Sequence, residues 1–334
     1  MSRKLLIMLM ALVCATSCLK HRPLDVLSTS VMIDLNNDYT MPYRQTYTKP
    51  DHFRIDVYDQ SSGLLDYKDF TPEPGGNISG IPGSYVFVAC NYDEGHMIIT
   101  GEDDIRTFHI SAAAADNSLK FIFEQCKAKA SEIITKDVVA SGAPGYESAE
   151  VSLEPENFWI GDRAAVVPPL AESDSTLVIP VDTRFAFRQG RIVVTNIGGL
   201  QYVSSIRVFL TNFCAGQYLI GGGLDRELTA ITFTLAKTSE PKTTYADFNY
   251  FGVLPDSAGL PHTAYLIITD TAGGQYLCIY DVTDQIHDGF NADILISADI
   301  DVPEPQSAGG GGFAPEVSNW TNVYIDVPLG QEED

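Results

Sequence analysis

The sequence predicts an all-β protein built as two tandem β-sandwich domains. Apolar residues alternate with polar ones over short runs, most of which are bounded by Gly, Pro, Asn or Asp, and this pattern is typical of strands with one buried face. About seven such runs occur in each half, a spacing that indicates β-sandwiches. The chain has 334 residues, 45% hydrophobic content, 16 Tyr and 16 Phe, so it can form two folded domains more readily than one.

The N-terminal residues have the layout of a secretory signal peptide that ends before a lipid-attachment cysteine. Two basic residues precede an apolar run at 5–13, and small residues lead up to Cys18. The run is about half as long as a bilayer-spanning helix, so we expect residues 1–17 to be removed. Acyl chains on Cys18 would hold the mature chain on a membrane, with residues 18–27 as a tether. The alternative is an ordinary signal peptide in which Cys18 is incidental.

The predicted N-terminal sandwich covers residues 28–182, and its first strand lies at 31–35. Residues 118–139 are ambiguous and are compatible with a short helix. Residues 141–169 are rich in Gly and Pro and predict loops. Further strands are expected at 53–58, 84–91, 97–100, 106–110 and 176–181.

The predicted C-terminal sandwich covers residues 183–330 and ends in a strand behind a glycine hinge. Four glycines at 309–312 predict a flexible joint. The terminal segment, 309–329, either closes its own sandwich or pairs with a neighbouring subunit. The apolar residues that alternate along it, and are candidates for strand exchange, are Val323, Ile325, Val327 and Leu329. The other strands of this half are expected at 185–196, 204–212, 230–235, 264–270, 275–282 and 293–302.

The sequence contains no recognisable catalytic, metal-binding or phosphate-binding motif. The nearest approach to a nucleophile elbow, at 76–80, has its serine one position late. The six histidines are scattered, with no pair at metal-ligand spacing. Neither glycine run, at 221–223 or at 309–312, is followed by the Lys and Ser/Thr of a phosphate-binding loop. We therefore predict no enzymatic activity, no metal and no cofactor.

The net charge limits the classes of binding partner, and the positions of the cysteines indicate whether they form disulfides. A net charge of −23 without a basic patch argues against nucleic-acid binding, which needs clustered Lys and Arg. Export permits disulfides, but lone cysteines in apolar alternating runs usually pack as small hydrophobic residues. We expect mostly free, buried thiols at the four remaining cysteines, which are Cys90, Cys126, Cys214 and Cys278.

One segment carries a family resemblance. In residues 78–91, Pro82 and Gly83 supply a turn, and an alternating apolar run follows from Tyr85 to Asn91. This segment resembles a strand of transthyretin-like sandwiches. The chain also resembles the fimbrillin-like lipoproteins of Bacteroides-type bacteria, including their minor-fimbrium anchoring subunits. The other stretches that support the resemblance are 157–162, 183–194 and 309–329.

The resemblance implies two tandem transthyretin-like (Greek-key) β-sandwich domains in an outer-membrane lipoprotein. Its partners would be other fimbrial subunits, joined by β-strand addition. In pilus-building members of that family an arginine-directed protease removes the first strand, and Arg44 is the matching candidate here. The residues after Cys18 are not the acidic cluster of many surface-exported lipoproteins, so the periplasmic and the cell-surface face both stay open.

Three function classes follow from these observations. The first is a non-enzymatic anchor or accessory subunit of a fimbria-like assembly. The second is a surface adhesin or a glycan- or protein-binding module, which would use exposed aromatic residues. The third, a glycan-processing enzyme, would need a deep acidic cleft with a perturbed carboxylate. The aromatic candidates for the second class are Trp159, Trp320, Tyr250 and Phe251.

Overall fold

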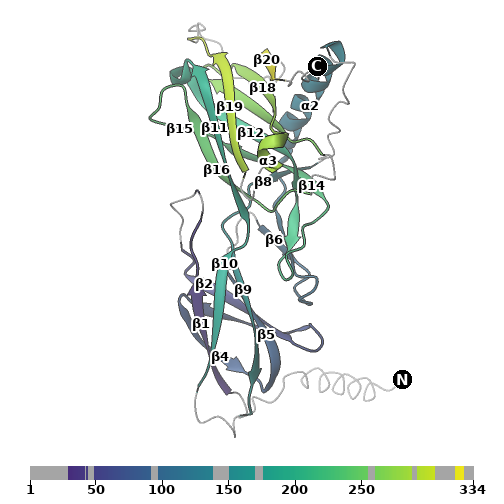
Figure 1. Cartoon of the computed structure of the whole chain (residues 1–334), viewed down its shortest axis with the longest axis vertical. Helices are drawn as coiled ribbons and strands as arrows, with labels where there is room; N and C mark the ends of the chain where they lie inside the picture. Colours follow the sequence, from purple (N-terminus) through teal and green to yellow (C-terminus); the bar gives the residue numbers. More distant parts are fainter. Residues whose placement is uncertain are drawn as a thin grey trace, which may run out of the picture.

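A computed structural model describes residues 29–41, 43, 49–91, 97–137, 150–169, 176–254, 260–287, 292–304 and 320–326; for 131–137 and 320–326 it describes the backbone alone. The described residues are mostly β, which confirms the all-β prediction at the level of fold class. Figure 1 shows an elongated molecule whose sheets are stacked in two halves, with most of the earlier strands in the lower half and the later strands in the upper half.

The lower half is a seven-stranded sheet in the order β3-β2-β5-β9-β10-β1-β4. β10 pairs with β1 along most of its length and with β9 at its end, so the sheet turns there and both of its parts face one core. Ile33, Phe53 and Phe87 in that core have no exposed surface. The strands are β1 (Thr29–Asn37), β2 (His52–Asp59), β3 (Leu65–Pro72), β4 (Gly75–Gly80), β5 (Gly83–Asn91), β9 (Trp159–Val167) and β10 (Leu177–Phe185).

The upper half contains a four-stranded sheet, in the order β15-β16-β11-β19, and a six-stranded sheet, in the order β20-β18-β17-β12-β14-β8. The two sheets share one core, in which Ile192 and Phe248 of the first meet Leu266 and Cys278 of the second. The strands are β8 (Glu150–Leu153), β11 (Arg188–Gly198), β12 (Val203–Cys214), β14 (Leu228–Thr234), β15 (Ala236–Lys237), β16 (Thr244–Tyr250), β17 (Thr263–Asp270), β18 (Gln275–Asp281), β19 (Ala292–Asp301) and β20 (Trp320–Asp326).

Helices cover parts of the upper half. α2 (Asn117–Asp137) lies on the face of the six-stranded sheet that points away from the shared core, where Phe123 stacks on Phe209 with ring centroids 5.3 Å apart. The short α3 (Thr283–His287) lies against β19. A single 3-10 turn, η3 (Leu200–Tyr202), joins β11 to β12. Within the ambiguous segment at 118–139, residues 118–137 belong to a long helix, and apolar side chains of its described part, up to residue 130, are buried on a sheet.

The chain passes between the halves more than once. α2 and β8 precede residue 182, yet α2 packs on strands that follow it and β8 pairs in parallel with β14. The chain then returns to the lower half through β9 and β10 before it enters β11. The predicted span 28–182 therefore contains a helix and a strand that pack with the other half.

A small sheet and an apolar cluster join the two halves. β6 (Met97–Thr100) and β7 (His109–Ala112) form a hairpin, and β13 (Gly216–Tyr218) pairs with β7. Beside them Phe158, Phe187 and Phe251 pack with residues of β5 and β7 in one buried cluster. The strand predicted at 106–110 begins only at His109, because the preceding residues form a turn.

The largest error of the strand prediction concerns β9, which lies where loops were expected. Its residues 160–167 pair with β5, so this is a central strand of the lower sheet. Gly161 of β9 lies close to the neighbouring strand, since a Cβ at this position would lie 2.2 Å from the carbonyl oxygen of Asp182. This glycine therefore allows two backbones to approach closely within a sheet.

Candidate strand-exchange sites

β1 is an interior strand. It pairs in parallel with β10 on one side and antiparallel with β4 on the other. Its inward side chains, Val31, Ile33 and Leu35, are 0%, 0% and 4% exposed. Loss of β1 would leave the facing backbone groups of β4 and β10 unpaired and would open a groove into the lower core, which is the kind of site that accepts an added strand.

Residues 38–41 and 43, called here the β1 extension, continue from β1 to the outer face of the four-stranded sheet. The backbone N–H of Asp38 donates to the carbonyl of Thr183 at 2.9 Å. At the far end, the N–H of Tyr43 donates to Oε1 of Gln189 at 3.3 Å. The Arg191 guanidinium lies over the Tyr43 ring, 5.0 Å from its centroid. The β1 extension therefore ties the first strand of the lower half to the upper half.

The Tyr43 ring sits in a polar, partly buried environment. Burial raises the pKa of its hydroxyl to about 12, with a further contribution from a hydrogen bond to Asp293. The neighbouring Arg191 is itself held by Asp247, which accepts from Nε at 2.6 Å and from Nη2 at 3.1 Å. No sequence motif pointed to these residues, because they come from separate strands and the contact depends on the tertiary fold.

β20 is an edge strand. Within the described residues it pairs with β18 alone, in parallel, with Val323 opposite Leu277 and Ile325 opposite Ile279. It therefore leaves one row of backbone donors and acceptors without a neighbouring strand. Five sequence-predicted features lie outside the described residues, namely Cys18, Arg44, the glycines at 309–312, Val327 and Leu329.

Where the two halves meet, a buried ion-pair network supports the apolar cluster. Arg54 of β2 contacts Asp56 at 2.8 Å and Glu102 at 2.8 Å, and Lys68 of β3 also contacts Glu102. Burial raises the pKa of Asp56 even though Arg54 opposes this shift. For Glu102, burial is outweighed by hydrogen bonds and charges from Lys68 and Arg54, and its pKa is lowered. These contacts fix the β6–β7 hairpin against the lower sheet.

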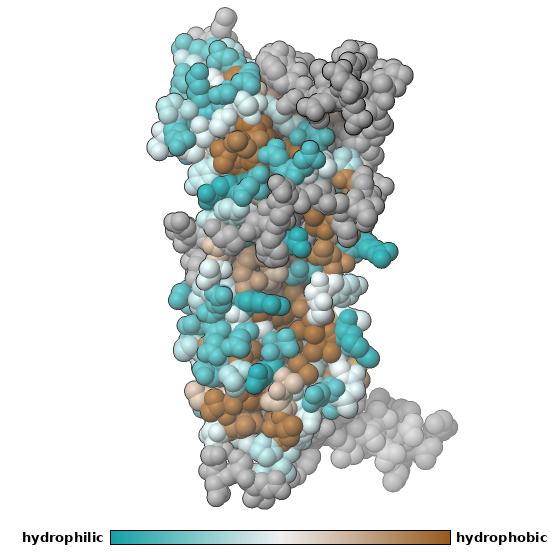
Figure 2. Space-filling model, in the orientation of Figure 1, coloured by the Kyte–Doolittle hydropathy of each residue, from teal (hydrophilic) through white to brown (hydrophobic). Residues whose placement is uncertain are grey.

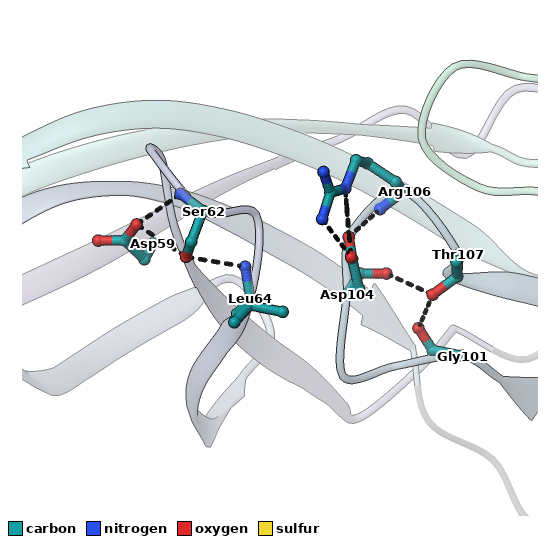
Figure 3. A network of polar contacts seen from close by, with 7 residues as sticks. All are labelled: Asp59, Ser62, Leu64, Gly101, Asp104, Arg106 and Thr107. Atoms are coloured by element: carbon teal, nitrogen blue, oxygen red, sulfur yellow. Dashed lines mark hydrogen bonds and ion pairs between the residues drawn. The ribbon is translucent and has the colours of Figure 1, made fainter.

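The turn before β7 is closed by its own side chains, as Figure 3 shows. Asp104 accepts from the Nε of Arg106 at 2.8 Å, and Thr107 donates to the carbonyl of Gly101 at 3.0 Å. Hydrogen bonds from Arg106 lower the pKa of Asp104 to about 2. A similar turn after β2 is held by Asp59, which accepts from Ser62. Each of these contacts joins residues that are close in the sequence, so they explain why the segments before β7 and after β2 fold as turns.

The aromatic platform proposed from the sequence is wrong for three of its four residues. Trp159, Tyr250 and Phe251 are 1%, 2% and 3% exposed because they fill the lower core, the upper core and the cluster between the halves. The side chain of the fourth, Trp320, lies outside the description. Apolar surface does occur elsewhere, in separate patches among hydrophilic residues on the face that Figure 2 shows.

The four cysteines of the body are buried and are not bonded to one another. Burial raises the pKa of the Cys90 thiol to about 12 and that of the Cys126 thiol to about 12. A high pKa keeps a thiol protonated and poorly reactive at neutral pH. The cysteines therefore pack as small hydrophobic residues.

In the described part of the chain, no group of three or more His, Cys, Asp or Glu residues could hold a metal ion. No described helix is both long enough and apolar enough to span a bilayer.

Solved structures similar to this one come from Bacteroidales. A "putative adhesin" from Bacteroides ovatus has a TM-score of 0.54 at 17% identity, over 84% of this chain and 94% of that one. A "putative cell adhesion protein" from Bacteroides eggerthii has a TM-score of 0.46 at 13% identity, over 88% and 92%. The fimbrial anchor protein Mfa2 from Porphyromonas gingivalis has a TM-score of 0.45 at 11% identity, over 80% and 90%.

At these sequence identities, similarity to a solved structure shows a shared fold alone. The neighbours are nevertheless adhesin-type and fimbrial proteins, which confirms the resemblance predicted from the sequence. A comparison with curated proteins gives no match. Residues 17–234 match the family described as a domain of unknown function, DUF5119. This match extends over more than half of the sequence, and the chain therefore belongs to the DUF5119 family.

Proposed function

We propose that this protein is a non-enzymatic, lipid-anchored subunit, an anchor or accessory of a fimbria-like cell-surface assembly, which joins its partner by β-strand addition. Acyl chains on Cys18 would hold one end at the outer membrane. β20 would supply the added strand, and the two halves would act as tandem transthyretin-like sandwiches. The fold shared with a Bacteroides adhesin-type protein supports the structural class.

The observation that carries the proposal is the pairing of β20. Among the described residues this strand has one neighbour and stands at the edge of its sheet, and in the sequence it follows a glycine run at 309–312. It can leave β18 without breaking any other strand pair of the described chain. Donation to a partner would replace the β18 pairing by an equivalent main-chain pairing on the partner's sheet.

A thiol lock on β20 tests this directly. Cys278 of β18 is the register partner of residue 324, and opposed residues of neighbouring strands lie within disulfide reach. Tyr324→Cys should therefore allow an oxidative lock of β20 onto β18. Fibre or partner-complex formation on cells should be lost when the lock forms and should return on reduction. Asn322→Cys, whose register partner is Tyr276, is the matched control because no thiol faces it.

Undiminished assembly of the locked protein would contradict donation by β20. The anchoring part of the proposal has its own test. Cys18→Ser should release the protein from the membrane fraction without changing its fold. Mass spectrometry of the mature protein from its host should give an N-terminus at Cys18, whereas a start after Arg44 would show that β1 is removed.

The second candidate function, a surface adhesin or a glycan- or protein-binding module, loses three of the four aromatic residues predicted for it, because these are buried.

A further inference from the structure

Four amide side chains, called here the junction amides, lie where the two halves meet. They belong to Asn91 of β5, Asn157 of the segment before β9, Gln189 of β11 and Asn249 of β16. Asn91, Gln189 and Asn249 are 1%, 0% and 0% exposed, and Asn157 is half-buried. An amide that is removed from water needs partners for its donors and its acceptor. The junction amides find partners in one another and in the backbone around them.

Hydrogen bonds connect the junction amides across both halves. In the upper half, Nε2 of Gln189 donates to Oδ1 of Asn249 at 2.9 Å, and Nδ2 of Asn249 donates to Oδ1 of Asn157 at 3.1 Å. On the lower side, Nδ2 of Asn91 donates to the carbonyl of Asn157 at 3.1 Å. Oδ1 of Asn91 accepts the backbone N–H of Trp159 at 2.6 Å. The series therefore runs from β11 and β16 of the upper half to β5 and β9 of the lower half.

Both ends of this series meet the β1 extension. At the upper end, Oε1 of Gln189 accepts the N–H of Tyr43 at 3.3 Å, and Nε2 donates to Sδ of Met41 at 3.7 Å. At the lower end, the ring of Tyr39 meets the ring of Trp159 edge-on, with centroids 5.4 Å apart. Tyr39 and Met41 also pack against the lower core. The β1 extension and the junction amides therefore form a closed circuit of contacts between the two halves.

Such a circuit is stable as a whole and is weakened by the loss of any member. A buried polar group that loses its partner destabilises the fold, and a buried network is favourable only while its members are satisfied. Displacement of the β1 extension would remove Tyr43 and Met41 from Gln189. It would also remove the ring of Tyr39 from Trp159. Both ends of the series would thus lose contacts at the same time.

We propose that the β1 extension is a clasp, and that the junction amides transmit its state to the contact between the halves. With the clasp closed, the two halves hold one relative orientation. When the β1 extension is displaced, the series loses its contacts at both ends and the halves move more freely. The apolar cluster and the small sheet at the junction keep the halves associated in either state. An event at the first strand therefore changes the geometry that the upper half presents to a partner.

Pulsed electron paramagnetic resonance between two spin labels tests the clasp. Val166 of the lower half and Leu295 of the upper half are 65% and 63% exposed, so cysteines at these positions can carry labels in a mature chain with Cys18→Ser. The four native thiols of the body are buried and should stay unlabelled. The distribution of distances between the labels should widen by about twofold or more in Gln189→Leu, which breaks the series beside the β1 extension.

Thr211→Val is the matched control, because it removes a buried acceptor within the upper half alone. Oγ1 of Thr211 accepts the N–H of Thr263 at 2.9 Å, and Thr211 has no exposed surface. This substitution should lower the thermal midpoint but leave the distance distribution unchanged. Amide exchange at Trp159, the far end of the series from Gln189, should be about tenfold faster in Gln189→Leu and unchanged in Thr211→Val.

Tyr39→Leu is a milder change at the lower end of the series, which keeps an apolar side chain there and should widen the distribution in the same direction. A distribution as narrow in Gln189→Leu or in Tyr39→Leu as in the parent would overturn the proposal, and so would equal widening by Thr211→Val. The clasp needs neither acyl chains on Cys18 nor donation by β20. The thiol lock on β20 can therefore fail while the clasp holds, and the reverse is also possible.

Discussion

β1 is the first strand of its sheet along the chain, and β20 is the last strand of its sheet, but the two are held by different contacts. β1 has a strand on each side and buries Val31, Ile33 and Leu35 in the lower core. The β1 extension adds contacts to Gln189 and Arg191 in the other half. β20 has one neighbour in the part of the chain that the structure describes, β18, and stands there at a sheet edge.

This difference shows which strand is suited to exchange. Withdrawal of β1 would break two strand pairings, empty part of a core and release the contacts of its extension. Withdrawal of β20 would break one pairing. A protein with this arrangement would donate its last strand readily and would give up its first strand only after a covalent change in the chain. Four experiments test whether β1 and β20 differ in this way.

Amide hydrogen exchange should show the largest difference between β1 and β20. Amides of β1 should exchange only through global unfolding of the lower half, whereas amides of β20 should exchange through local opening. A gap of about 4 kcal/mol between the two processes corresponds to about a thousandfold difference in rate. Mass-spectrometric or NMR exchange measures it. Similar rates in both strands would remove the contrast on which the proposal of β20 donation rests.

Ile33→Ala should destabilise the protein by about 2–5 kcal/mol, because it opens a cavity where a fully buried side chain packs. Chemical denaturation monitored by circular dichroism gives the change. Met32→Ala is the control in the same strand, since Met32 is 40% exposed, and it should cost less than about 0.5 kcal/mol. Equal effects of the two substitutions would mean that β1 is not a core strand.

Removal of the Tyr43 ring tests the β1 extension. Tyr43→Ala should cost about 1 kcal/mol, the usual size of a partly exposed cation–π contact. A double-mutant cycle with Arg191→Met isolates the coupling between the two side chains, which should be about 0.5–1 kcal/mol. A coupling indistinguishable from zero would show that the extension does not secure β1.

Deletion of residues 309–334 should have the smallest effect on stability. The net gain of about 0.5–1.5 kcal/mol per hydrogen bond of an edge strand is largely offset by about 1–2 kcal/mol of ordering entropy per residue. We therefore expect a thermal midpoint close to that of the full chain, together with loss of fibres or partner complexes on cells. Loss of cooperative unfolding would place β20 in the core of its own half.

The sequence identified strands well where alternation was strong and uninterrupted. β1 and β19 follow the predicted apolar periodicity because one face of each is buried. β3 and β4 were not predicted. β4 has the sequence Gly-Gly-Asn-Ile-Ser-Gly, whose single apolar side chain gives no periodic signal, and its place in the sheet comes from pairing with β1.

The local sequence pattern could not predict which distant elements pack against one another. Nothing in residues 117–137 indicates that the helix packs on strands a hundred residues later, because its apolar positions would fit any sheet face. The site residues show the same limit. Cys18 and the alternation at 323–329 were found from local pattern, whereas the contact of Tyr43 with Arg191 joins residues far apart in the sequence and depends on the tertiary fold.

The parallel pairing of β1 with β10 also decides how the molecule would carry a mechanical load. β1 is entered from the N-terminal side at Thr29, and β10 continues from Phe185 towards β11 in the other half (Figure 1). A pull between a membrane tether and the upper half would draw these two strands in opposite directions along a common axis. The backbone bonds between residues 31–37 and 177–183 would then be strained all together, as in a lap joint under shear, and not opened one after another.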